Sequence, residues 1–472
     1  MLFNSVEFLL FLPIVFLAYW AIRDRSRQNL FLIAASYFFY GWWDWRFLIL
    51  IIISSLVDYI LGIKISRSTG QLRRRNLLLL SLLTNLGILG IFKYYNFFID
   101  TFQAVLGTIG MANSTSSLSI ILPVGISFYT FQTLSYTIDI YRKKLEPTHD
   151  PVAFFAFVAF FPQLVAGPIE RAGNLLPQFL KRRRFDRAQA NDGLKQILWG
   201  FFKKLVIADN LALRVDSIFM NYGGLGSGDL LLGLIFFSFQ IYCDFSGYSD
   251  IAIGTAKLFN IKLTRNFAFP YFSRDIGEFW RRWHISLSTW FRDYLFIPLG
   301  GSRTRRLRYI MNILIVFSVS GLWHGPNWTF VVWGLLNGLF YIPLIFRAGS
   351  KTTGTVAEGR LLPTGREALS MGITYFQTLV AWAFFRADTV ADGLSYLGRM
   401  FSTPGQIESK NLYYFAVILA FVAVEWLSRF KIHALTFTGA RRPIRWAIYG
   451  TLLLTILYFG IFHGQAFIYF QF

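Results

Sequence analysis

The chain has 472 residues, of which 55% are hydrophobic, 19% aromatic and 15% charged, whereas an ordinary soluble domain carries about 25% charged residues. With a mean hydropathy of +0.47, this composition excludes a disordered chain, disfavours a soluble multidomain enzyme and indicates a polytopic membrane protein. The net charge is +21, and the single cysteine, Cys243, excludes an intramolecular disulfide and a cysteine-ligated metal site.

A transmembrane helix needs roughly 20 mostly apolar residues. Clear runs of this kind cover residues 8–22, 47–65, 77–92, 309–323, 328–346, 368–385, 412–427 and 447–462. Shorter or interrupted apolar runs cover residues 30–40, 122–140, 152–165, 230–242 and 251–259. We therefore predict an all-α polytopic membrane protein, a single domain over residues 1–472, with about 11 transmembrane or embedded helices.

Lysine and arginine gather between these runs, at residues 23–27, 64–75, 142–144, 181–184, 303–308, 347–366 and 429–445. The alternate segments 41–46, 93–119 and 387–411 are poor in both residues. By the positive-inside rule the basic segments face the cytoplasm, which predicts an extracytoplasmic N-terminus and an extracytoplasmic tail from His463 onward. The positive charges separate helices and form no stripe with interleaved aromatics. We therefore expect contact with membrane lipid headgroups and no nucleic-acid partner.

The familiar motifs of soluble enzymes are absent from the sequence. It contains no GxSxG, HExxH, CxxC or Walker motif, and none of its five histidines is followed by aspartate in an H-x4-D pattern. We predict no metal site. Candidate catalytic residues must therefore be polar groups within or beside apolar runs, where ionisable side chains are costly and mark functional sites.

His324 is the first candidate, within the segment SGLWHGPN at residues 320–327. Glycines allow close approach and proline breaks the helix, so the segment indicates a helix end that lines a cavity. An imidazole titrates near neutral pH, which suits a general base. The neighbours Trp323 and Asn327 are then expected to line the cavity. The alternative is a loop histidine hydrogen-bonded to a carbonyl.

His284 is the second candidate, within residues 278–295. At 100° per residue the aromatic side chains, Trp280 among them, fall on one arc, with Arg281 and Arg282 opposite. This pattern predicts one amphipathic helix at or dipping into the membrane. His284 lies near the edge of the apolar arc. It is either a histidine that orients a substrate or a histidine whose hydrogen bonds are satisfied at the headgroup boundary.

The third candidate is the segment at residues 240–250, which joins two apolar runs and carries Asp244 and Asp250. These carboxylates either cap helices around Gly247 or line the same cavity, paired with an arginine such as Arg281 or Arg282.

Two further segments stand out. Residues 162–171 contain two prolines and a glycine after an apolar run and indicate a re-entrant turn. The chain ends in the aromatic stretch 467–472, which either forms an interfacial belt or brings the Tyr469 hydroxyl to the active site as an acyl acceptor.

Together these segments resemble the membrane-bound O-acyltransferase superfamily, and most of all its bacterial branch typified by alginate O-acetyltransferases. The resemblance covers nearly the whole chain. It rests on the opening MLFNS, ILPVGISFYTF at 121–131, the 162–171 stretch, DFSGYSD at 244–250, residues 278–295, GLWHG at 321–325 and the aromatic tail.

The resemblance implies a ring of membrane helices around a thinned central funnel, in the bacterial inner membrane. His324 matches the catalytic histidine and His284 the second family histidine. The implied reaction moves an acetyl group from a cytoplasmic thioester, acetyl-CoA, across the membrane, and a periplasmic hydrolase-like acetyltransferase partner then completes transfer onto a polysaccharide acceptor. In this scheme a neutral His324 takes the hydroxyl proton, and His284, Asn327 or a backbone N–H near Gly325 holds the oxyanion.

Several alternatives stay open at this stage. The acceptor polymer is alginate-like, peptidoglycan, cellulose or teichoic acid, the last with a D-alanyl group from a carrier protein. A transporter for a lipid-linked sugar would also suit broken helices and a polar cavity. It is disfavoured because we find no inverted repeat and no paired interrupted helices.

Overall fold

The computed structural model describes the chain except for residues 112–117, 119, 166, 347–353, 438, 463–466 and 471–472. Every regular element in these described parts is a helix, which confirms the all-α prediction. Two compact units are distinguished, residues 1–193 with 252–264, and residues 194–251 with 265–472. The predicted ring around a thinned centre concerns the arrangement of both units and stays a prediction, as does the single domain.

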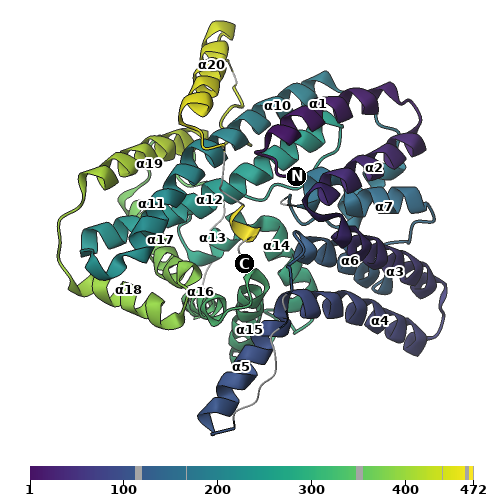
Figure 1. Cartoon of the computed structure of the whole chain (residues 1–472), viewed down its shortest axis with the longest axis horizontal. Coiled ribbons are helices and arrows are strands. Elements are labelled where there is room, and N and C mark those ends of the chain that lie inside the picture. The colour runs from purple at the N-terminus through teal and green to yellow at the C-terminus, as the bar shows by residue number, and fades with distance from the viewer. Residues whose placement is uncertain are drawn as a thin grey trace. The chain divides into compact units, whose positions relative to one another are not determined.

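The first unit contains nine helices of its own among the described residues: α1 (Val6–Ala21), α2 (Arg25–Asp44), α3 (Leu48–Arg67), α4 (Gln71–Leu89), α5 (Tyr95–Thr108), α6 (Ile126–Tyr141), α7 (Pro151–Ala159), α8 (Phe161–Leu164) and α9 (Ala172–Leu180). Helix α3 packs against α4 and α6, and α2 packs against α7 (Figure 1). Between α3 and α4 the buried Asp58 accepts hydrogen bonds from Ser81 Oγ at 2.6 Å and Asn85 Nδ2 at 2.8 Å. Such polar contacts hold helices together where lipid offers no hydrophobic driving force.

The second unit carries all the predicted site residues. Its helices are α11 (Asp209–Met220), α13 (Ile276–Arg282), α14 (Ile285–Phe291), α15 (Arg306–His324), α16 (Trp328–Phe346), α17 (Gly365–Arg386), α18 (Val390–Ser402), α19 (Ser409–Ser428) and α20 (Arg442–Phe459). Helices α10 (Arg187–Phe201) and α12 (Ser227–Leu258) have residues in both units. A π-helical turn, η3 (Phe202–Ala208), joins α10 to α11.

Seven described helical segments are long and apolar enough to cross a membrane: Arg25–Arg67, Gln71–Thr108, Ser227–Leu258, Arg306–His324, Trp328–Phe346, Gly365–Arg386 and Ser409–Ser428. The shorter helix α1 is also apolar. The polytopic character is thus confirmed, whereas the predicted number of about 11 embedded helices is not. The start of the predicted outer tail, His463, lies outside the described residues.

The prediction of one amphipathic helix over residues 278–295 is wrong, because the segment breaks at His284. Helix α13 ends at Arg282, α14 begins at Ile285, and His284 between them has left-handed backbone torsions with φ of 43°. The backbone of residues 266–268 supplies the hydrogen bonds that a continuous helix would make internally. Asn266 O accepts the Ile285 N–H, and the Ala268 N–H donates to Arg282 O, both at 2.9 Å. The expected apolar side chains are nonetheless buried, Trp283, Leu287 and Trp290 among them.

Candidate active site

A close crossing of α15 and α16 positions His324. A Cβ on Gly321 would lie 2.1 Å from Phe330 O, and one on Gly334 would lie 2.2 Å from Phe317 O. Only glycines permit this approach of two backbones, because any Cβ would overlap a carbonyl. The backbone then turns sharply, since α15 ends at His324 and α16 starts at Trp328. His324 therefore stands at the end of a rigid helical hairpin, at the helix end that the sequence predicted.

Aromatic rings surround the His324 imidazole. Its ring centre lies 4.9 Å from that of Trp333 on α16, 5.5 Å from that of Phe385 on α17 and 5.0 Å from that of Trp323. His324 is only 2% exposed. These neighbours carry no formal charge, so the immediate environment of the imidazole is apolar and suits an uncharged reacting group.

His284 lies in the same cluster, with its ring centre 6.4 Å from that of His324 and 6.0 Å from that of Trp323. Its Nδ1 accepts a hydrogen bond from the Leu287 N–H at 3.3 Å and so caps α14. An accepting Nδ1 places the proton of the neutral imidazole on Nε2. Burial lowers the pKa of His284 to about 3, which keeps the ring neutral near pH 7.

The Nε2 atom of His284 is buried and has no hydrogen-bond partner among the described residues. A left-handed backbone at a residue other than glycine or asparagine is strained, and such strain concentrates at functional sites. His284 therefore presents an N–H donor with a fixed direction inside the cluster. This geometry can orient a carbonyl or hydroxyl oxygen.

The end of the chain completes the cluster. The Tyr469 ring lies 5.4 Å from the His324 ring, 6.3 Å from the His284 ring and 4.5 Å from the Phe245 ring. The Phe467 ring packs against the Tyr248 ring at a tilt of 40°, with the ring centres 4.4 Å apart, and the Tyr469 hydroxyl oxygen is buried. The tail residues 467–469 are therefore packed into the unit rather than spread over its surface.

Asp244 fastens this tail from α12. Its Oδ2 accepts the Ile468 N–H at 2.7 Å, and its Oδ1 pairs with Lys204 Nζ at 2.8 Å. Lys204 also pairs with Asp209 at 2.7 Å, and all three side chains are at least 95% buried. Asp250 pairs with Lys203 at 2.6 Å and accepts a second bond from Gln196. The partners of Asp244 and Asp250 are thus lysines, and the predicted pairing with Arg281 or Arg282 is wrong.

Sequence reasoning missed Lys203 and Lys204. Both belong to η3, and their placement against α12 depends on a second close crossing, because a Cβ on Gly200 would lie 2.7 Å from Gly247 O. The signal was present, since two lysines interrupt the apolar stretch 197–208 and Asp209 follows it directly, and ionisable residues are costly in such a stretch. Trp333 and Phe385 were missed for a different reason, because single aromatics within apolar helices are indistinguishable from membrane-facing ones.

Other predicted site residues lie elsewhere in the second unit. Asn327 caps α16 by accepting the Thr329 N–H and donating to Asp388 O, both at 3.0 Å. Trp280 packs on Trp333 and donates to Asn337 Oδ1 at 3.3 Å, so it lies behind the ring that contacts His324. Arg282 pairs with Glu278 at 2.8 Å, and Arg281 is exposed at the end of α13.

Comparison with known proteins identifies the family of the chain. Residues 142–380 match the family model of the membrane-bound O-acyltransferases, a span that includes Asp244, His284 and His324. This chain belongs to the membrane-bound O-acyltransferase family. The resemblance drawn from the sequence is thereby confirmed, and the protein is an O-acyltransferase.

Related acyltransferases of this family differ in their named acceptors. The chain is 39% identical over 404 residues to the probable alginate O-acetylase AlgI of Pseudomonas aeruginosa, covering 85% of this chain and 75% of the relative. It is 36% identical over 452 residues to the corresponding protein of Azotobacter vinelandii, covering 93% and 87%. It is also 36% identical over 436 residues to the peptidoglycan O-acetyltransferase of Helicobacter pylori, covering 86% and 80%.

Proposed function

We propose that this membrane-bound O-acyltransferase moves an acetyl group from acetyl-CoA on the cytoplasmic side to an extracytoplasmic, alginate-like polysaccharide, with His324 as general base. The observation that carries the proposal is the meeting of His324, His284 and Tyr469 in one buried aromatic cluster. The names of several relatives, alginate O-acetylases, support acetyl transfer to a polysaccharide.

In the proposed step, a hydroxyl oxygen attacks the carbonyl carbon of the thioester. His324 takes the hydroxyl proton as the C–O bond forms. The Nε2–H of His284 donates to the carbonyl oxygen as negative charge develops there, which stabilises the transition state more than the ground state. The C–S bond then breaks, and the proton on His324 passes to the departing thiolate. Atoms and charge balance, since the products are an ester and a thiol.

The residues around His324 fit the acyl end of acetyl-CoA and not its phosphates. The rings of Trp333, Phe385 and Trp323 form an apolar surround, which suits a methyl group and a thioester and excludes water from the ester product. The anionic phosphates would lie away from these rings, towards the basic cytoplasmic loops such as residues 303–308.

Tyr469 carries a hydroxyl group on a ring of this cluster. Its ring lies beside His324, and its tail is predicted to be extracytoplasmic. We propose that Tyr469 accepts the acetyl group as a tyrosyl ester. A periplasmic hydrolase-like acetyltransferase partner would then transfer the acetyl group to a sugar hydroxyl and release the phenol. The enzyme would thereby pass an acyl group across the inner membrane without moving the donor.

Peptidoglycan is the second candidate acceptor, favoured by the Helicobacter pylori relative. Cells lacking the protein distinguish the two acceptors when O-acetyl groups are measured separately in the exopolysaccharide and in the peptidoglycan. The leading proposal predicts loss of acetyl groups from the exopolysaccharide alone. Loss of acetyl groups from peptidoglycan alone would make peptidoglycan the acceptor. An unchanged acetyl content in both polymers would contradict acetyl transfer, and so would loss of D-alanyl groups from teichoic acid.

A further inference from the structure

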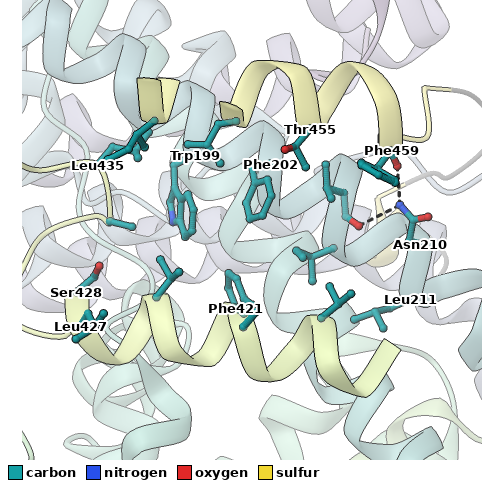
Figure 2. A pocket seen from close by; sticks show the side chains of 18 of the residues that line it. Trp199, Phe202, Asn210, Leu211, Phe421, Leu427, Ser428, Leu435, Thr455 and Phe459 are labelled. Atoms are coloured by element: carbon teal, nitrogen blue, oxygen red, sulfur yellow. Dashed lines mark hydrogen bonds between the residues drawn. The ribbon is translucent and has the colours of Figure 1, made fainter. Parts of the chain in front are cut away.

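An apolar groove of about 670 Å³ lies between α19 and α20 (Figure 2). Phe421 and Leu427 line it from α19, Leu452 from α20, and Trp199 and Phe202 from α10 and η3. The volume falls in the range of sites that hold small organic ligands, about 300–1,000 Å³. We call this feature the α19–α20 groove.

Protein side chains leave the groove open because α20 is poorly covered. Ile456 is the one buried residue of this helix among those described, and α20 packs mainly on η3. Helix α19 is one of the seven candidate membrane spans, so we expect a groove along it to face hydrocarbon. If the groove were empty, the residues that line it would lose dispersion contacts. The acyl chains of bilayer lipids can fill it.

One end of the groove is positively charged. Lys431 lines it directly, just beyond the end of α19. Arg445 and Arg441 precede the lining residue Ile448 by three and seven positions, which places them on the same face around the start of α20. None of these three cations has an ion-pair partner in the described part of the chain. They are therefore available to an external anion.

Among the described lining residues, none at the opposite end is charged. There Asn210 donates from its side-chain amide to Phe459 O at 2.9 Å and to Val206 O at 3.0 Å, so the polar groups are satisfied within the protein (Figure 2). The groove is thus asymmetric, with cations at one end and an apolar body. This asymmetry matches a lipid with an anionic headgroup and a hydrocarbon chain.

We propose that the α19–α20 groove is a binding site for an anionic phospholipid, with one acyl chain along the groove and the phosphate at Lys431, Arg441 and Arg445. Basic pockets at the membrane surface select anionic headgroups, whereas apolar lining alone gives no preference between lipids because their chains are equally apolar. The predicted cytoplasmic position of residues 429–445 assigns the lipid to the inner leaflet. The site is independent of acyl transfer by His324.

The test compares lipid retention by the full-length protein in nanodiscs of equal phosphatidylglycerol and phosphatidylcholine content. After extraction into detergent, the bound lipid is identified by native mass spectrometry. We expect the wild-type protein to retain roughly tenfold or more phosphatidylglycerol than phosphatidylcholine. The double variant Lys431→Ala/Arg445→Ala should lose this preference, and Leu452→Trp, which fills the groove without changing charge, should retain little of either lipid.

The matched control is Arg73→Ala/Arg75→Ala, which removes two exposed cations from α4, a helix of the first unit that contributes no residue to the groove lining. It should keep the wild-type preference. An equal loss of the phosphatidylglycerol preference in the control would mean that the preference follows the overall charge of the protein, and it would overturn the proposal. A wild-type preference in the Lys431→Ala/Arg445→Ala variant, or a co-purified partner helix in place of lipid, would overturn it as well. Because the double variant alters only exposed or partly exposed side chains, its result stands even where Leu452→Trp fails to fold.

Discussion

Asp244, in the middle of α12, accepts the backbone N–H of Ile468 at 2.7 Å across 224 residues of sequence. The bond fixes the residue that precedes Tyr469, so the same carboxylate that pairs with Lys204 also sets the position of the phenol beside His324. The Asp244 carboxylate therefore links the buried ion pair with Lys204 to the position of the tail.

Asp244→Asn should release the tail and lower acetyl transfer. The amide keeps the shape of the carboxylate but loses its charge, and removing one partner of a buried ion pair costs about 3–5 kcal/mol. We expect kcat to fall while KM for the thioester changes little, because the tail is no part of the donor site. Hydrogen exchange of the 467–470 backbone should rise at the same time.

Asp250→Asn is the matched control for this prediction. It removes the carboxylate that pairs with Lys203 on the same two elements but leaves the bond to Ile468 in place. Its stability should fall without faster exchange in the tail. Equal exchange of the tail in both variants would mean that Asp244 contributes only to stability.

His284→Asn separates the two functions of this histidine. Asparagine tolerates left-handed torsions and can cap α14 through Oδ1, so the break between α13 and α14 is expected to persist. The variant lacks the Nε2–H donor, and the loss of one oxyanion donor lowers kcat by about 10²–10³-fold. Thermal unfolding close to that of wild type, together with this loss, is the expected result. Full activity would exclude a role in oxyanion stabilisation.

Tyr469→Phe tests the tyrosyl ester. Phenylalanine keeps the ring contacts with Phe245 and His324 and removes only the hydroxyl. The variant should fail to acetylate the polymer, and peptide mass spectrometry should find an acetylated C-terminal peptide in wild type only. Tyr458→Phe, at a position 87% exposed on α20, is the control and should remain active. Normal polymer acetylation by Tyr469→Phe would exclude the tyrosyl ester and leave Tyr469 with a packing role in the cluster.

Gly321→Ala should displace His324. The added Cβ would lie 2.1 Å from Phe330 O, so α15 and α16 must separate, and overpacking of this kind costs about 1–3 kcal/mol. We expect a lower unfolding temperature and reduced acetyl transfer. Gly372→Ala on α17 meets no atom within 4 Å and should stabilise its helix by roughly 0.5–1 kcal/mol. A Gly321→Ala protein as active and stable as Gly372→Ala would contradict the close crossing.

The sequence predicted those parts of the site that depend on local signals. Glycine and proline around His324 indicated a helix end, and the aromatic arc predicted which side chains of 278–295 are buried. It did not predict features that depend on distant segments. The break at His284 requires the backbone of Asn266 and Ala268, and the lysine partner of Asp244 comes from a turn some 40 residues earlier, so no local pattern distinguishes these partners from arginines nearby.

We propose His324 as the base for acyl transfer, and the acetyl transfer activity of His324→Ala tests this role. The measurement follows labelled acetyl groups from acetyl-CoA to the polysaccharide in membranes containing equal amounts of folded protein, with His149→Ala, at an exposed position, as control. We expect His324→Ala to fold but to transfer no more label than membranes lacking the protein, while His149→Ala transfers normally. Normal transfer by folded His324→Ala would contradict this role.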